Sequence, residues 1–277
     1  GVGLARIEFI INNFIQVHPN ALINYDRITD IELKKKISNL IITYDNPINY
    51  YVNKLSYGIA KIAAAFYPKP VIVRFSDFKS NEYANLLGGK DYEPIEENPL
   101  IGWRGCSRYY SDKFKSAFGL ECQAIKYVRN IIGLDNVIVM LPFVRTINEC
   151  IKVQDTMKEY GLERGIDNLQ IYLMCEIPSN VILIKEFCKY VDGISIGSND
   201  LCMLTLGCDR DSELITHIYD ERNDAVKKMI SKAIKYCKKI GKKIGICGNA
   251  PSCYPDYAKF LIEQEIDTIS VTIDCLI

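Results

Sequence analysis

Short runs rich in Val, Ile and Gly alternate with longer amphipathic stretches along the chain, and this alternation restricts the fold more than any other feature. The strand candidates are residues 2–9, 71–77, 137–143, 171–177, 193–197, 243–248 and 268–273. Helical patterns fill the gaps at residues 30–43, 47–66, 111–132, 146–160, 180–190, 224–240 and 256–264. Repeated βα units of this kind predict a parallel sheet covered by helices.

A closed αβ barrel accounts for this pattern best. The chain has 277 residues, of which 48% are hydrophobic, so it can bury one large core. A TIM (β/α)8 barrel has eight strands, each followed by a helix. Because the chain shows seven strands and opens in one, we expect a barrel that lacks its first strand and last helix. Residues 1–277 are then one domain, a fragment of a larger multidomain enzyme.

Charge and composition restrict the classes of partner and the cellular location that the chain can have. Lys plus Arg and Asp plus Glu are equal at 34 each, which argues against a nucleic-acid or anionic-membrane partner. The apolar runs are far shorter than the roughly 20 residues of a membrane span. The 11 cysteines form no Cys-x-x-Cys pair, so we expect free thiols and a cytoplasmic protein. No phosphate-binding loop is present, which indicates that the chain does not bind ATP by itself.

Charged residues stand at or near the ends of several predicted strands, where the active site of a barrel lies. The arginines of this set are Arg6, Arg74 and Arg104, and the carboxylates are Glu176 and Asp200. Each could instead cap a helix or pair with a neighbour across the rim. Together they suit an anionic, metal-bound substrate, because guanidinium groups bind phosphate or carboxylate and two carboxylates can hold Mg²⁺.

Other candidate residues allow two interpretations. Cys247 stands at the end of the strand predicted at 243–248. A buried cysteine most often serves as a small apolar residue. At the mouth of a barrel, however, the Cys247 thiol could act as a general acid–base. Arg108 is either a site residue or a surface or helix-start residue. Trp103 is expected to anchor the long loop at 78–110, and His18 and His217 to be structural.

Several segments taken together resemble the C-terminal phosphoenolpyruvate (PEP)/pyruvate-binding domain of the PEP-utilising enzymes, and among them the phosphoenolpyruvate synthases. The segments are residues 1–9, 71–83 and 97–104, Cys-Glu-Ile-Pro-Ser-Asn at 175–180, Ser-Ile-Gly-Ser-Asn-Asp at 195–200, and Ile-Cys-Gly-Asn-Ala-Pro-Ser at 246–252. The resemblance implies an enzyme that makes PEP, AMP and phosphate from pyruvate, ATP and water. A phosphohistidine on another domain then carries the phosphoryl group to pyruvate.

The resemblance also implies roles for individual residues. Substrate contacts would come from Arg6, Arg74, Arg104, Asn199, Arg210, Glu176 and Asp200. Glu176 and Asp200 would bind Mg²⁺, and Cys247 would exchange the proton at C3. The expected partners are pyruvate or PEP, the phosphohistidine and nucleotide-binding domains of the same enzyme, and a second copy in a homodimer.

Three alternatives stay open. The chain could be a truncated, non-catalytic PEP-binding module, another PEP-utilising enzyme such as pyruvate phosphate dikinase, or a lyase of 2-oxo acids on the same barrel. Departures from the family pattern favour the first. Cys202 and Met203 stand where Thr and Gln are usual, Thr272 and Ile273 replace Asn and Pro, and Cys253 and Tyr254 replace more polar residues.

Overall fold

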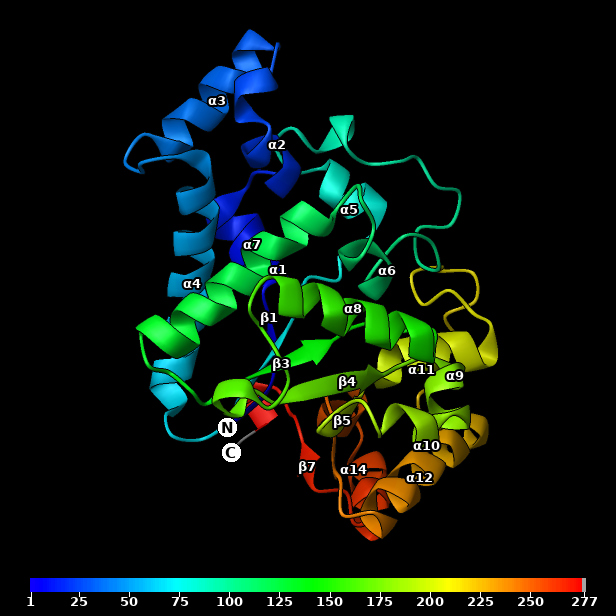
Figure 1. The fold of residues 1–277 in the computed structure, drawn as a ribbon. Coiled ribbons are helices and arrows are strands. Elements are labelled where there is room, and N and C mark those ends of the chain that lie inside the picture. Colours follow the sequence, from blue (N-terminus) through cyan, green and yellow to red (C-terminus); the bar gives the residue numbers. More distant parts are fainter. Residues whose placement is uncertain (276–277) are drawn as a thin grey trace.

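Seven parallel strands form one sheet in the order of the sequence (Figure 1). The computed structural model describes residues 1–275. The strands are β1 (Val2–Arg6), β2 (Val71–Arg74), β3 (Val137–Leu141), β4 (Ile171–Cys175), β5 (Gly193–Ile196), β6 (Lys243–Ile246) and β7 (Thr268–Ile269). Their sequences are rich in Val and Ile, as expected for strands that are buried on both faces. Helices cover the outer face, and side chains from the other strands cover the inner face. All seven predicted strands are therefore confirmed.

The sheet curves so that its two edges approach each other. Gly3 of β1 lies against Ser270, directly after β7, and a Cβ atom on Gly3 would come within 1.9 Å of the Ser270 Oγ. Only glycine allows this close approach. The fold is a parallel barrel of the TIM type, as predicted.

Helices of very different length surround the strands (Figure 1). The longer ones are α3 (Ile31–Ile41), α4 (Pro47–Phe66), α7 (Lys115–Lys126), α8 (Ile147–Glu159), α11 (Ser198–Leu206), α12 (Asp224–Lys239) and α14 (Pro255–Glu263). The shorter α-helices are α1 (Glu8–Ile10), α2 (Pro19–Ile23), α5 (Ser80–Ala84), α6 (Cys106–Tyr109), α9 (Pro178–Ile182), α10 (Ile184–Phe187) and α13 (Ala250–Cys253). Single 3₁₀ or π turns are η1 (Ile11–Ile15), η2 (Tyr25–Arg27), η3 (Gly89–Asp91), η4 (Tyr127–Ile131), η5 (Ile166–Asn168) and η6 (Ile273–Cys275).

Local sequence explains where several helices begin. The Asp30 side chain accepts a hydrogen bond from the Leu33 N–H and caps α3, as its position predicts. Asn46 caps α4 in the same way, and Pro47 occupies the first helical position, where its missing N–H costs nothing. The helix predicted at 47–66 therefore has the predicted bounds.

Other predicted boundaries were wrong. The first strand ends at Arg6 because the chain turns into α1 at Glu8, and the last strand keeps two of its six predicted residues. The helix predicted at 180–190 is two short helices, α9 and α10, and α9 already begins at Pro178. The predicted long loop contains α5, η3 and α6. These boundaries depend on tertiary contacts that the local pattern does not contain.

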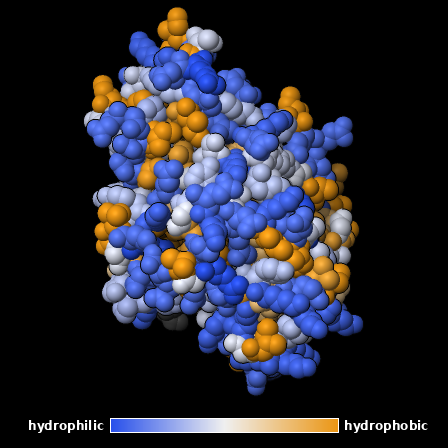
Figure 2. All heavy atoms as spheres, in the orientation of Figure 1, coloured by the Kyte–Doolittle hydropathy of each residue, from blue (hydrophilic) through white to orange (hydrophobic). Residues whose placement is uncertain are grey.

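The surface mixes polar and apolar side chains. Figure 2 shows apolar residues in small groups among hydrophilic ones on the face in view. Within residues 1–275, no helix is both long and apolar enough to cross a bilayer.

Candidate functional site

A cavity of about 670 Å³ opens at the carboxyl ends of the strands. Its lining includes all eight residues singled out from the sequence: Arg6, Arg74, Arg104, Glu176, Asn199, Asp200, Arg210 and Cys247. They come from β1, β2, the segments after β4 and β6, the first turn of α11 and two loops. Parallel strands bring such distant residues together, because all their carboxyl ends meet at one end of the barrel.

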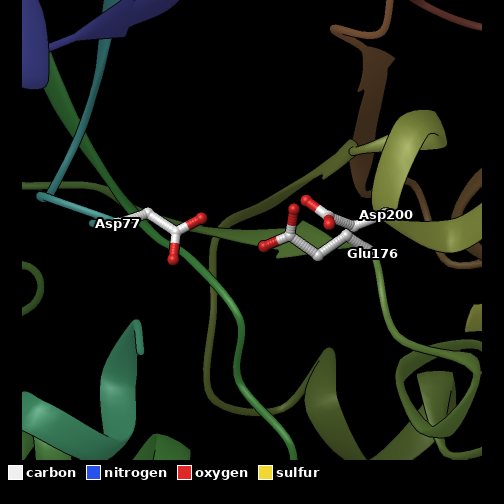
Figure 3. A group of neighbouring side chains, drawn as sticks. All are labelled: Asp77, Glu176 and Asp200. Atoms are coloured by element: carbon white, nitrogen blue, oxygen red, sulfur yellow. The ribbon is translucent and has the colours of Figure 1, made fainter. Parts of the chain in front are cut away.

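Three buried carboxylates form the centre of the cavity. Asp77, Glu176 and Asp200 each place an oxygen within 4.8 Å of the other two (Figure 3). Figure 3 shows the carboxylates of three separate segments pointing toward one another. The pKa of Glu176 is raised well above its usual value by burial and by the nearby charges of Asp200 and Asp77. Asp77 is the last residue of the strand predicted at 71–77, and its place in this cluster was missed.

Arg104 joins two of these carboxylates. Its Nε donates a hydrogen bond to the Asp77 Oδ1 at 3.0 Å, and its Nη2 donates to the Asp77 Oδ2. Its Nη1 lies 3.3 Å from the Asp200 Oδ1. Burial alone would raise the pKa of Asp77, but the charges of Arg104 and Arg74 outweigh it and hold the pKa below its usual value. The ion pairing across the rim that the sequence left open is therefore present.

Arg74 is held from the side of β1. Its Nη2 donates to the Glu8 Oε1 at 2.6 Å, and its Nη1 lies 3.6 Å from the Asp77 Oδ2. The buried Nε of Arg74 has no hydrogen-bond partner among the described residues. An unpaired buried donor is costly, and Arg74 is one of the residues that line the cavity. Glu8 was predicted on a strand, and its contact with Arg74 was missed.

The oxygen donors suit a divalent metal ion. Both Asp77 oxygens accept bonds from Arg104, whereas the Arg104 bonds to the two Asp200 oxygens are longer, at 3.3 and 3.4 Å. The Glu176 Oε1 accepts a hydrogen bond from the Phe143 N–H at 2.6 Å. Crowded buried carboxylates repel one another unless a cation compensates them. Carboxylate oxygens are the ligands that Mg²⁺ prefers. The carboxylates present could therefore hold a divalent metal ion.

The backbone around Glu176 fixes the position of its carboxylate. Phe143 has a φ of 49°, which is uncommon for a residue with a side chain, and this turn directs its N–H to the Glu176 Oε1. The Asn180 side chain accepts hydrogen bonds from the N–H groups of Glu176 and Ile177. Asn180 therefore lies in the first turn of α9, and its side chain orders the segment between β4 and that helix.

Three predicted residues lie at the margin of the cavity. Arg6 is exposed and points from the end of β1. Arg210 is partly buried and lies 3.7 Å from the Asp211 carboxylate. The Asn199 Oδ1 faces the segment after β6 and accepts a hydrogen bond of 3.4 Å from the Asn249 N–H. These side chains are less restrained than Arg74 and Arg104, so they can adjust to a ligand.

Cys247 faces the cavity from the end of β6 and is 8% exposed. The Ser195 hydroxyl donates a hydrogen bond to its Sγ at 3.3 Å. Burial raises the pKa of the thiol to about 11, which the Ser195 hydrogen bond partly offsets. At neutral pH Cys247 is therefore a thiol that can donate a proton. Of the other ten cysteines, eight are buried and two are exposed, and all are free.

Arg108 holds the loop that carries Arg104. It is fully buried, and its two Nη atoms bond the Glu93 carboxylate at 2.8 and 2.7 Å. Its Nε donates to the Trp103 carbonyl at 2.8 Å, and its guanidinium lies 4.1 Å from the centre of the Trp103 ring. The interpretation of Arg108 as a surface residue was wrong. Trp103 contributes to anchoring the loop, as predicted.

The departures from the family pattern lie at different distances from the cavity. Cys202 and Met203 are buried and do not line it, so their apolar side chains remove no polar group from its wall. Cys253 and Tyr254 do line it. Thr272 is exposed, and its N–H bonds the Ser252 hydroxyl. The side chain of Ile273, and residues 276 and 277 of the predicted domain, lie outside the described residues.

Comparison with known proteins gives a consistent result over the whole chain. The family described as "PEP-utilising enzyme, PEP-binding domain" matches residues 1–277. Proteins named phosphoenolpyruvate synthase are 58% identical over 279 residues in Synechocystis, 53% over 277 in Escherichia coli and 51% over 322 in Aquifex aeolicus. Each alignment covers 100% of this chain but only 34%, 35% and 38% of the relative. The chain thus spans about a third of the length of these relatives.

A solved structure is also similar. It is an HpcH/HpaI aldolase/citrate lyase family protein from Burkholderia cenocepacia, with 14% identity and a TM-score of 0.43 over 79% of this chain and 84% of that chain.

Proposed function

Since this chain belongs to the PEP-utilising enzymes, as their PEP-binding domain, we propose that its cavity binds pyruvate and PEP and hosts the transfer of a phosphoryl group to the enolate of pyruvate, which gives PEP. The donor is a phosphohistidine on another domain of the full-length protein. The observation that carries the proposal is the group of three buried carboxylates and two buried arginines in one cavity. Such a group is suited to a metal-bound anion and has little value as a stabilising core.

The metal-binding residues are Glu176 and Asp200, with Mg²⁺ as the ion. When bound, Mg²⁺ supplies positive charge that stabilises an oxyanion and substrate phosphate oxygens. The protein's own contribution is to hold the two carboxylates in position. The Phe143 N–H and the Asn180 side chain hold Glu176. Arg104 holds Asp200. Oriented ligands of this kind need no rearrangement before binding.

The arginines receive the anionic groups of the substrate. The Arg74 guanidinium offers its unpaired Nε–H, and Arg104 offers positive charge above the ring of Phe143. Arg6, Arg210 and Asn199 close on the substrate from the rim. Phosphoryl transfer requires mainly positioning and positive charge, because negative charge on the phosphoryl oxygens persists through the transition state.

Cys247 moves the proton at C3. In the direction of PEP synthesis, its thiolate accepts a proton from the methyl group of pyruvate, and the electrons of the C–H bond form the C2–C3 double bond of the enolate. The enolate oxygen then attacks phosphorus, and the histidine nitrogen leaves. In reverse, the Cys247 thiol donates its proton to C3. Its raised pKa favours the thiol form that the reverse step needs.

The complete reaction needs parts beyond this chain, which spans about a third of its relatives. We assign to those parts the phosphohistidine and the ATP site, and to the whole protein the conversion of pyruvate, ATP and water to PEP, AMP and phosphate in the cytoplasm. The names of the relatives favour this over a dikinase that uses phosphate. A homodimer stays an expectation.

Solvent exchange of the pyruvate methyl protons tests the chemistry without ATP or the other domains. The 277-residue chain in D₂O should replace methyl protons by deuterium when Mg²⁺ is present, and a chelator should stop the reaction, as NMR would record. A folded chain that binds pyruvate but catalyses no exchange would support the non-catalytic module instead.

A further inference from the structure

Glu121 of α7 is a fully buried carboxyl outside the cavity, and it has no ion-pair partner among the described residues. Both of its oxygens bond a single residue. The Ser76 hydroxyl donates to the Glu121 Oε1, and the Ser76 N–H donates to the Glu121 Oε2 at 3.1 Å. Burial raises the pKa of Glu121 to about 8. A lone buried carboxyl is a poor means of stabilising a core, because desolvation opposes it.

Ser76 lies on the segment that joins two cavity residues, Arg74 and Asp77. Two further side chains hold it. The Tyr83 and Ser76 hydroxyls are 2.7 Å apart, and the Tyr109 hydroxyl donates to the Ser76 carbonyl at 2.7 Å. With the two bonds to Glu121, every polar atom of Ser76 has a partner. The backbone of this segment therefore has little freedom to shift.

The next residue connects this network to the site. The Asp77 N–H donates to the Glu8 Oε1 at 2.7 Å, the same oxygen that binds Arg74. The Asp77 carboxylate pairs with Arg104 and lies beside Glu176 and Asp200. A displacement of Ser76 would thus move the partner of Arg104 and alter the cavity.

We propose that Glu121 is a positioning residue that fixes the 74–77 segment from behind, through Ser76, for binding of PEP with Mg²⁺. This inference rests on the proposed function. It adds a residue on α7 that does not line the cavity and acts on the affinity for PEP and Mg²⁺ through Ser76 and Asp77. Partners of directly binding residues commonly change affinity by about 10- to 100-fold when they are removed.

Three variants of the 277-residue chain test this role. Glu121→Leu removes both acceptors, Ser76→Ala removes the hydroxyl, and Glu121→Gln keeps the shape and most of the hydrogen bonds. Ser56→Ala is the matched control, because Ser56 is also buried, and its hydroxyl bonds backbone carbonyls on α4 and α7 away from the cavity. Calorimetry with PEP and saturating Mg²⁺ gives the Kd, and urea unfolding gives the stability.

We expect Glu121→Leu and Ser76→Ala to raise the Kd for PEP by about tenfold or more. Glu121→Gln should restore most of the affinity, and Ser56→Ala should lose stability with an unchanged Kd. If Glu121→Leu does not fold, the Kd for PEP of Ser76→Ala is compared with that of Ser56→Ala, and this comparison tests the positioning role. If the wild-type chain binds PEP and Ser76→Ala binds it with the same Kd, the role of Glu121 is overturned while the proposed function stands. A folded wild-type chain that binds no PEP would overturn it together with the proposed function.

Discussion

Among single residues, Cys247 has the most specific assignment, because the thiol has the cavity on one side and Ser195 on the other. Cys247→Ala removes the proton donor but leaves the arginines and carboxylates in place. We expect exchange of the pyruvate methyl protons to fall by at least about 100-fold, the usual scale of general acid–base catalysis. The affinity for PEP should stay nearly the same, since none of the anion-binding groups changes.

Cys150→Ala is the matched control for this variant. Cys150 is also a buried free thiol, but it lies on α8, outside the cavity, where Gln154 bonds its sulfur. This control should retain exchange. Equal exchange rates in Cys247→Ala and the wild-type chain would remove Cys247 from the mechanism and leave the proton to another group.

At the level of elements, the segment from α5 to α6 determines where Arg104 lies, and Arg108 anchors it through Glu93 and Trp103. Arg108→Met keeps much of the side-chain volume but leaves the Glu93 carboxylate without its guanidinium partner. Breaking a buried pair in this way costs about 3–5 kcal/mol. We expect a loss of that size in urea unfolding, with a weaker affinity for PEP because Arg104 loses its support.

Arg27→Met is the control, since Arg27 is exposed and lies on η2, outside the cavity. It should unfold like the wild-type chain. If Arg108→Met unfolds at the same urea concentration as this control, the ion pair with Glu93 does not hold the segment.

The elements also show how far sequence reasoning reaches. The seven strands and α4 were predictable because buried Val and Ile runs and a capping Asn-Pro are local signals. The change from β1 to α1 at Glu8 was not, since Glu8 binds Arg74, 66 residues away, and no local pattern contains that contact. Likewise α11 was missed, although Asp200 on it was predicted. Local patterns predict element types, whereas their ends depend on distant partners.

The site shows the same division. All eight predicted residues line one cavity because strand ends in a parallel barrel converge. Asp77 was visible as a charge after β2, but its place beside Glu176 depends on how Arg104 returns from its loop. Glu121 left no signal, because a single Glu in an amphipathic helix is ordinarily a surface residue.

At the scale of the whole molecule, the crowded carboxylates of the site lower the free energy of unfolding of the protein without metal ions. Glu176→Gln removes an ionisable oxygen ligand from the buried cluster but keeps an acceptor for the Phe143 N–H. We expect this variant to be at least as stable as the wild-type chain without metal ions. At 100 times its Kd, Mg²⁺ should stabilise the wild-type chain by about 2.7 kcal/mol and leave the variant unchanged.

Thermal unfolding with and without Mg²⁺ measures both effects, and Glu213→Gln, a change at an exposed glutamate, is the control that should respond to Mg²⁺ normally. An equal Mg²⁺ response in Glu176→Gln would show that the ion binds elsewhere.

The central claim is that the carboxylates and arginines of this cavity bind PEP together with a divalent cation. Titration calorimetry of the 277-residue chain with PEP, in buffer with Mg²⁺ and in the same buffer with EDTA, tests it most directly. The account predicts one site per chain with Mg²⁺ and no measurable binding with EDTA. Binding of equal affinity in both buffers, or no binding in either by a chain that unfolds cooperatively, would contradict it.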